Sequence, residues 1–191
     1  MSSNPVIWQP STARIRASGL YGFMQQQGFD NYDALYQWSV EKSPEFWTAL
    51  CDFCDIEMAR EADTIIARPN DIMNAGWFEG AELNFASHLL RHTGNNAAIV
   101  FCGEDGSRQQ ISRDELRDVV ARLARSLRAM GVEKGDRVAG FLPNCPEAVV
   151  AMLATASIGA IWSSCSPDFG STGVIDRFGQ IEPKVLFAAN A

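Results

Sequence analysis

The stretch RVAGFLPNCPEAVVAMLATASIGAIWS, residues 137–163, decides the fold of this chain. The residues that follow Arg137 are nearly all apolar, as in a strand that is buried on both faces. Pro146 suits the first turn of a helix, and residues 148–158 are apolar almost all round, which predicts a helix buried on several sides. Residues 160–163 predict a second strand. A strand, a helix and a strand joined by short loops favour an α/β fold with parallel strands.

The same alternation continues toward the N-terminus. Residues 97–102 predict a compact apolar strand, and residues 108–111 are expected to pair back on it after a glycine-containing turn. Ser112 and Glu115 fit a capping box, which predicts the start of a long amphipathic helix. Gly131 is expected to end that helix.

Toward the C-terminus, the pattern predicts a helix from residue 171 to about residue 180, capped by Ser171 or Thr172, and a last strand over 185–188. The whole order predicts an open, mostly parallel sheet with packed helices. Because an open sheet usually continues, the sequence is expected to be cut rather than finished.

Residues 1–95 have a different character and predict a helical N-terminal extension. Helical spacing is seen over 32–40, and Ser43 and Pro44 are expected to open a further helix. Residues 60–76 have no clean period and are interpreted as a surface connection, and residues 82–92 predict another short helix. We therefore expect two domains, 1–95 and 96–191.

The composition favours a globular protein. The net charge of −7 argues against a general nucleic-acid surface, and 47% hydrophobic residues are enough for a core. Residues 148–162, the longest mostly apolar stretch, are too short to span a membrane. Residues 1–5 lack a basic start followed by an apolar run, so no secretory signal is expected. Five cysteines without disulfide-scaffold density favour reduced thiols and a cytoplasmic location.

Several stretches together carry a specific resemblance. They are residues 36–41 (YQWSVE), 44–47 (PEFW), 77–86 (WFEGAELNFA), 131–138 (GVEKGDRV) and 143–148 (PNCPEA). These stretches resemble the acetyl-/acetoacetyl-CoA synthetase group of the adenylate-forming, or AMP-binding, acyl-CoA synthetase superfamily. Residues 163–170 (SSCSPDFG), 176–178 (DRF) and 180–186 (QIEPKVL) are similar to the acetoacetyl-CoA synthetase branch of that group.

The resemblance implies the activity and its small molecules. A full-length member makes an acyl-adenylate from a carboxylic acid and ATP, releases pyrophosphate and transfers the acyl group to CoA. The resemblance implies ATP, CoA and Mg²⁺ as cofactors and acetoacetate as the acid. It also implies that this chain is an N-terminal fragment of the enzyme. The fold implied is the helical extension followed by the first α/β subdomain of the AMP-binding domain.

The sequence also lacks parts that this chemistry requires. It has no Ser/Thr/Gly-rich phosphate loop that ends in lysine. The family's adenine-binding motif, ribose-binding aspartate and catalytic lysine would all lie beyond residue 191. We therefore expect no catalytic residue here, no bound cofactor and no ligase activity from the chain alone. Three alternatives stay open: an acetyl-CoA or other short-chain acyl-CoA synthetase, a non-catalytic α/β binding module, and a small doubly wound nucleotide-binding enzyme.

One turn is a candidate binding element. Pro167, Asp168 and Gly170 precede the helix expected at residue 171, and the resemblance implies that this turn lies close to CoA in the full enzyme. Helix N-termini favour phosphates, whereas the Asp168 carboxylate would repel them. The alternative is a plain strand-to-helix turn with a cap.

Other residues suggest chemistry less strongly. His88 and His92 are four apart, but no acidic or cysteine partner stands at a matching spacing, so a polar helix face is favoured and no metal site is expected. Cys51 and Cys54 form a single C-x-x-C in an amphipathic helix and are interpreted as packed thiols. Three tryptophans are expected to pack the extension onto the α/β domain or onto parts of the enzyme outside this chain, and their exposure would invite self-association: Trp38, Trp47 and Trp77.

Overall fold

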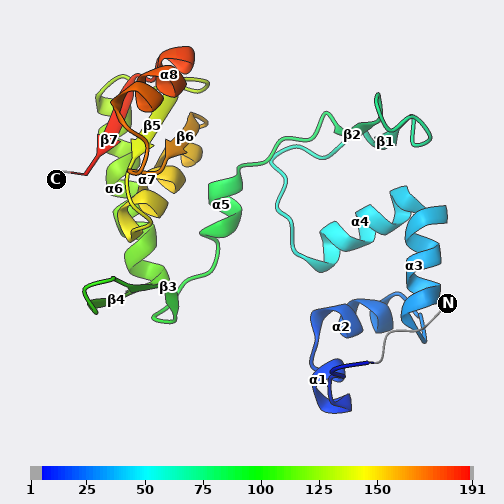
Figure 1. Cartoon of the computed structure of the whole chain (residues 1–191). Helices are drawn as coiled ribbons and strands as arrows, with labels where there is room; N and C mark the ends of the chain where they lie inside the picture. The colour runs from blue at the N-terminus through cyan, green and yellow to red at the C-terminus, as the bar shows by residue number, and fades with distance from the viewer. Residues whose placement is uncertain (1–5, 190–191) are drawn as a thin grey trace. The chain divides into compact units, whose positions relative to one another are not determined.

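The computed structural model describes residues 6–189, so the expectation about residues 1–5 lies outside the described residues. The chain divides into two compact units, Met1–Leu83 and Asn84–Ala191 (Figure 1). The boundary expected between residues 95 and 96 falls inside the second unit, and the domain boundary itself stays a prediction. No described helix is long and apolar enough to cross a membrane.

The first unit is built mainly from helices, as the sequence predicted. They are α1 (Thr12–Arg16), α2 (Gly19–Gln26), α3 (Tyr32–Glu41) and α4 (Ser43–Phe53). Their core contains Phe23, Met24 and Leu35, surrounded by aromatic rings. The Phe46 ring lies edge-on to the rings of Phe23 and Trp38, with centroids 5.9 and 5.7 Å away. Aromatic packing of this kind adds to the stabilisation that burial supplies.

Two details of this unit differ from expectation. Ser43 does not cap α4, because Lys42 holds the N-cap position and the Ser43 hydroxyl donates instead to the Ser39 carbonyl at 2.8 Å. Helices α3 and α4 are almost continuous, so the serine finds an acceptor in the preceding turn. Part of the expected surface connection is a hairpin of β1 (Thr64–Ala67) and β2 (Gly76–Glu79). Strands of four residues are too short to show a period in the sequence.

The second unit contains the α/β sheet. Its elements are α5 (Phe85–Leu89), β3 (Ala97–Cys102), β4 (Arg108–Ser112), α6 (Arg113–Ala129), β5 (Arg137–Phe141), α7 (Pro146–Ser157), β6 (Ile161–Cys165), α8 (Ser171–Ile181) and β7 (Val185–Ala188). Three parallel strands pair in the order β6-β5-β7. The α/β class and the parallel sheet are confirmed.

Strand β3 departs from the expected sheet. Within the described residues it pairs with β4 in an antiparallel hairpin of its own and does not join the parallel sheet. Its side chains alternate between exposed and half-buried from Val100 onward, with Val100 66% exposed. A short run of six apolar residues cannot distinguish a central strand from a hairpin strand, and the adjacent turn brings β4 within reach first.

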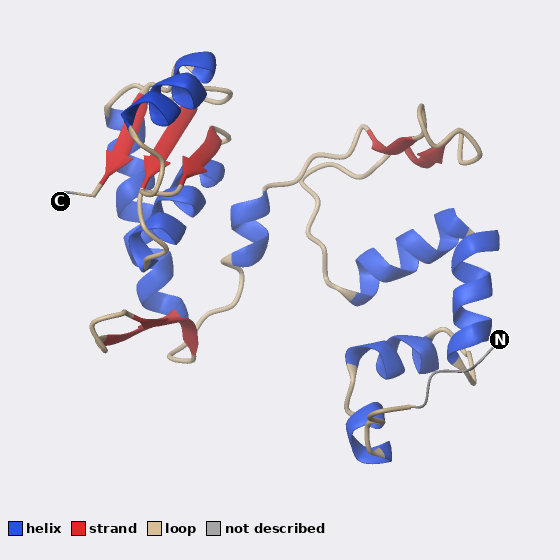
Figure 2. Ribbon diagram, in the orientation of Figure 1, coloured by secondary structure: helices blue, strands red, loops and turns tan. Residues whose placement is uncertain are grey.

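Helices cover both faces of the sheet (Figure 2). Helices α6 and α7 pack on the face that carries Val138, Trp162 and Phe187. Helix α8 packs on the other face, where Phe178 contacts the cluster of Ala139 and Cys165. Because the central strand β5 is buried on both sides, its position fixes where the flanking loops emerge.

The ends of α6 follow the sequence closely. The Ser112 Oγ accepts from the Glu115 N–H at 3.2 Å, and the Ser112 N–H donates to the Glu115 carboxylate at 2.8 Å, which completes the capping box. The hydrogen bond from the Ser112 N–H, followed by one from the Ser112 hydroxyl at 2.7 Å, lowers the pKa of the Glu115 carboxyl group. At the other end, Gly131 adopts φ = 81°, a left-handed conformation that suits glycine and ends the helix.

The segment after Gly131 ties the sheet to α6. The Asp136 carboxylate accepts from the Lys184 ammonium at 2.8 Å and from the Glu133 N–H at 2.7 Å. The hydrogen bond from Lys184, followed by the one from Glu133, holds the pKa of Asp136 below its ordinary value. Lys184 also donates to the Gly131 carbonyl at 2.6 Å, so one ammonium joins strand β7 to the end of α6.

Gly140 has no room for a side chain. A Cβ atom built there would lie 2.5 Å from Cη2 and Cζ2 of Trp162, whose indole crosses the strand at this point. The Trp162 and Phe187 rings, with centroids 6.2 Å apart, fill the same face of the sheet. A glycine in β5 therefore permits a tryptophan in β6.

We expect Gly140→Ala to destabilise the chain by about 1–3 kcal/mol, because the new methyl group must displace a packed indole. Thermal unfolding would measure the loss, and adding Trp162→Leu should recover part of it. Gly179→Ala is the matched control, since Gly179 lies in α8 with open space around it and should gain about 0.5–1 kcal/mol. Equal effects of the two alanines would contradict the packing argument.

We expect Asp136→Asn to lower the melting temperature at neutral pH. Since the folded-state pKa of Asp136 is depressed, its stabilisation is present above the unfolded value of about 3.9 and is lost as the pH falls through the folded pKa. The gap in melting temperature between the parent chain and Asp136→Asn should therefore close in acid. The control is Asp118→Asn on the exposed face of α6, and a gap that persists unchanged at low pH would refute this account.

Candidate functional site at the carboxyl edge of the sheet

The parallel register brings three strand ends to one edge of the sheet. Strands β5, β6 and β7 end at Phe141, Cys165 and Ala188. Phe141 pairs with both Cys165 and Ala188 in register. The loops that follow β5 and β6 therefore leave from the same edge. Ligands of open α/β sheets bind at this carboxyl edge, which makes it the candidate site.

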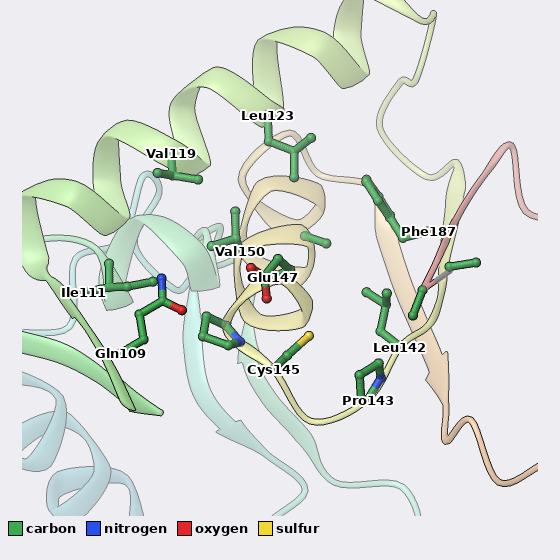
Figure 3. Close-up of a pocket in the computed structure, with 14 residues that line it drawn as sticks. Gln109, Ile111, Val119, Leu123, Leu142, Pro143, Cys145, Glu147, Val150 and Phe187 are labelled. Atoms are coloured by element: carbon green, nitrogen blue, oxygen red, sulfur yellow. The ribbon is translucent and has the colours of Figure 1, made fainter. Parts of the chain in front are cut away.

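The larger cavity at this edge has a volume of about 640 Å³ (Figure 3). Figure 3 shows Val119 and Leu123 projecting toward it from α6, and Val150 and Glu147 from α7. Phe187 of β7 contributes to the same wall. The walls are mainly apolar, so the cavity is suited to an apolar group rather than to a phosphate.

A smaller cavity of about 290 Å³ lies between the loops after β5 and β6. Leu142 and Pro143 line both cavities. Trp162, Ser164 and Pro167 line only the smaller one. Two serines, Ser164 and Ser166, also line the smaller cavity, so it offers polar groups that can position a ligand by hydrogen bonding.

The turn predicted from the sequence lies beside the smaller cavity. Pro167, Asp168 and Gly170 are all exposed, but of these three only Pro167 lines the cavity. The Ser166 hydroxyl donates to the Asp168 carboxylate at 2.7 Å, and the Asp168 N–H donates back to Ser166 Oγ at 3.3 Å. The negative charge of Asp168 is therefore held within the turn by a neutral partner and is not neutralised.

The start of α8 differs from expectation in its cap. Gly170, rather than Ser171 or Thr172, holds the N-cap position, and no side chain caps the helix. A glycine at the N-cap position has no oxygen to offer, so the first N–H groups of α8 are not bonded by a cap side chain. Arg177, about two turns further on, lies over the Phe169 ring with its Cζ 3.9 Å from the ring centroid.

Sequence reasoning missed the contact between Arg177 and Phe169. Phe169 lies in the turn and Arg177 in the helix, so no helical spacing relates them. The sequence signal for their contact is only that an aromatic residue stands eight positions before a basic one. The contact places a cation next to the acidic turn. Cys145 and Glu147 of the larger cavity were also missed, because a cavity arises from the arrangement of several elements.

The weaker candidates do not line either cavity at this edge. Helix α5 ends at Leu89, so His92 lies beyond it and the expected shared helix face with His88 is wrong. Among residues 6–189, no three or more His, Cys, Asp or Glu side chains are grouped so that they could hold a metal ion. In the first unit, burial, followed by the charge of Asp52, raises the pKa of the Cys51 thiol. Cys54 is exposed, so the expectation of a packed thiol is wrong at that position.

Three tryptophans of the first unit pack on one another or on phenylalanine rings. The Trp47 ring lies edge-on to Trp77 at 5.5 Å and to Phe46 at 5.3 Å. Trp38 contacts Phe29, with centroids 5.2 Å apart. Trp77 is still 52% exposed. The self-association expected from such exposure stays a prediction.

Comparisons with known proteins extend along nearly the whole chain. The family model described as AMP-binding enzyme matches residues 86–191, and the model described as acetyl-coenzyme A synthetase N-terminus matches residues 32–89. The chain is 42% identical to an acetoacetyl-coenzyme A synthetase of Rhizobium meliloti (strain 1021), covering 100% of this chain and 30% of the relative. It is 46% identical to an acetoacetyl-CoA synthetase of Gallus gallus, covering 97% and 29%.

A solved structure agrees with these matches. The structure of acetoacetyl-CoA synthetase from Streptomyces lividans superposes with a TM-score of 0.86 at 40% identity, covering 95% of this chain and 29% of the other. The chain therefore spans 29–30% of the length of these relatives.

Proposed function

The chain belongs to the AMP-binding enzyme family, and on this premise we propose that it forms the N-terminal part of an ATP-dependent acid–thiol ligase. The observation that carries the proposal is the extent of the match to curated acetoacetyl-CoA synthetases, which covers 97–100% of this chain at 42–46% identity. The helical first unit is included in that match, in addition to the α/β unit. The proposed reaction converts acetoacetate, ATP and CoA to acetoacetyl-CoA, AMP and pyrophosphate.

The reaction has two steps in this proposal. The acetoacetate carboxylate attacks the α-phosphorus of ATP, which forms the acyl-adenylate and expels pyrophosphate. The CoA thiol then attacks the acyl carbon and AMP leaves. Both steps require cations or backbone N–H groups around the phosphates. A lysine-terminated phosphate loop is absent from this sequence, so ATP and Mg²⁺ would be bound by other parts of the enzyme.

Residues 1–95 would then serve as the helical extension and residues 96–191 as the first α/β subdomain. The matches of the two family models, 32–89 and 86–191, support a division of this kind. A cytoplasmic location stays a prediction from the cysteine usage.

We further propose that the turn of Pro167, Asp168 and Gly170 lies close to CoA in the full enzyme. Its place at the carboxyl edge and the lack of a capping side chain at Gly170 support this role. The Asp168 carboxylate argues against this role, because its negative charge near the phosphates of CoA would weaken CoA binding. In this role the aspartate would limit CoA affinity rather than provide it.

One observation favours a second candidate. The model that matches residues 32–89 is named for acetyl-coenzyme A synthetase, so acetate is the competing acid. The two candidates share the whole mechanism and differ only in the acyl pocket.

The substrate prediction is tested with the protein from the complete reading frame that contains this chain. Acyl-CoA formation should be fastest with acetoacetate when acetoacetate, acetate and butyrate are compared at equal concentration. The 191-residue chain alone should form no acyl-CoA. Acetate as the clearly best acid would establish the second candidate instead, and ligase activity of the chain alone would refute the division of labour.

The CoA-proximal turn is tested by Asp168→Asn, which keeps an acceptor for the Ser166 hydroxyl and removes the charge. We expect the KM for CoA to fall by about fivefold, since an exposed charge interaction contributes about 1 kcal/mol. The kcat and the KM for ATP should stay unchanged. The control is Asp176→Asn on α8, and an unchanged KM for CoA in Asp168→Asn would remove the turn from the CoA site.

A further inference from the structure

A third cavity, of about 340 Å³, lies between α5, β3, α6 and α7 of the second unit. We propose that it binds a small aliphatic carboxylate, with the Arg113 guanidinium as the anchor for the carboxylate group. The cavity shares no lining residue with the two cavities at the carboxyl edge. The proposal concerns binding by this chain and does not depend on the ligase reaction.

The charges around this cavity are one-sided. Arg113 and His92 both line it, and no acidic side chain does. The chain as a whole carries a net charge of −7. A cavity wall with basic side chains and no acidic ones therefore differs in charge from the chain as a whole. Such a wall attracts an anion.

Arg113 is half-buried and lacks a counterion. In the part of the chain that the structure describes, its side chain makes no ion pair and no hydrogen bond. None of its guanidinium nitrogens is among the fully buried, unpartnered polar atoms of the described residues, so the group stays accessible to an anion that enters from solvent. Guanidinium groups bind carboxylates through two parallel hydrogen bonds, so a carboxylate matches this anchor.

The neighbouring acids are already engaged elsewhere. The Asp114 carboxylate accepts from the Gly94 N–H at 2.8 Å, and the Glu115 carboxylate accepts from Ser112 in the capping box. The Arg113 N–H donates to the Asn96 carbonyl at 3.0 Å, which fixes the backbone beside the cavity. These bonds hold the acids in local structure and leave the Arg113 guanidinium for a ligand.

The remaining walls select an apolar body. Leu90, Leu116, Val149 and Leu153 line the cavity, and Leu116 and Leu153 are also part of the buried core. A ligand with a charged head and a short hydrocarbon chain would satisfy both parts of the cavity. A phosphate or a sugar would leave the leucine walls uncovered, so we commit to a monocarboxylate with an aliphatic chain.

The test titrates the complete 191-residue chain with hexanoate and follows backbone amide signals by NMR. We expect saturable shifts centred on Arg113 and on the cavity residues of α5, β3 and α7. Arg113→Gln should weaken binding at least tenfold, whereas Arg113→Lys, which keeps the charge, should retain most of it. Arg117→Gln, on an exposed part of the same helix, is the matched control and should bind as the parent chain does.

Two further ligands separate the head from the chain. Hexan-1-ol should bind at least tenfold more weakly than hexanoate, and inorganic phosphate should not displace hexanoate. The proposal is overturned if hexanoate gives no saturable shift, if Arg113→Gln and Arg117→Gln weaken binding equally, or if the shifts centre on the carboxyl-edge cavities. Thermal unfolding of each variant shows whether a loss of binding reflects a loss of fold.

Discussion

The burial of β5 on both faces is the constraint on which the second unit depends. Val138 and Ala139 are adjacent, point to opposite sides of the sheet and are both fully buried. One is covered by α6 and α7, and the other by α8. Because neither face can turn toward water, the register of β6 and β7 against β5 is fixed. The shared register in turn brings the loops after β5 and β6 to one edge, where the candidate site is found.

The parts of the fold that could be predicted are those in which two independent sequence signals agree. For α6, the capping box, the apolar stripe and Gly131 all define the same helix. For β5, α7 and β6, composition and loop length agree. The errors occur where a single signal was used. The side chains of Ser43, Ser171 and Thr172 are each able to cap a helix. Which residue holds the N-cap position, however, depends on where the backbone enters the helical conformation. The pairing of β3 with β4 was predicted and is confirmed. That β3 stays outside the parallel sheet of the described residues was not predictable, because an apolar strand does not show which sheet it joins.

The candidate site was predictable only in outline. The turn at Pro167, Asp168 and Gly170 was identified through resemblance, and its place at the carboxyl edge follows from the parallel register. The three cavities were not predictable, since each is lined by side chains from segments far apart in the sequence. The half-buried Arg113 illustrates this limit. In the sequence it is one of five arginines between residues 113 and 129. Only the packing of α5 and α7 around it makes it distinctive.

The link from Lys184 to Asp136 and to the Gly131 carbonyl joins residues 48 and 53 positions apart. During synthesis the ribosome releases β5 and the end of α6 well before Lys184 emerges. Until then the Asp136 carboxylate lacks this partner, and one edge of β5 is open to pairing with other chains. The nascent chain is therefore exposed to mispairing at this edge in the interval between the emergence of β5 and that of β7.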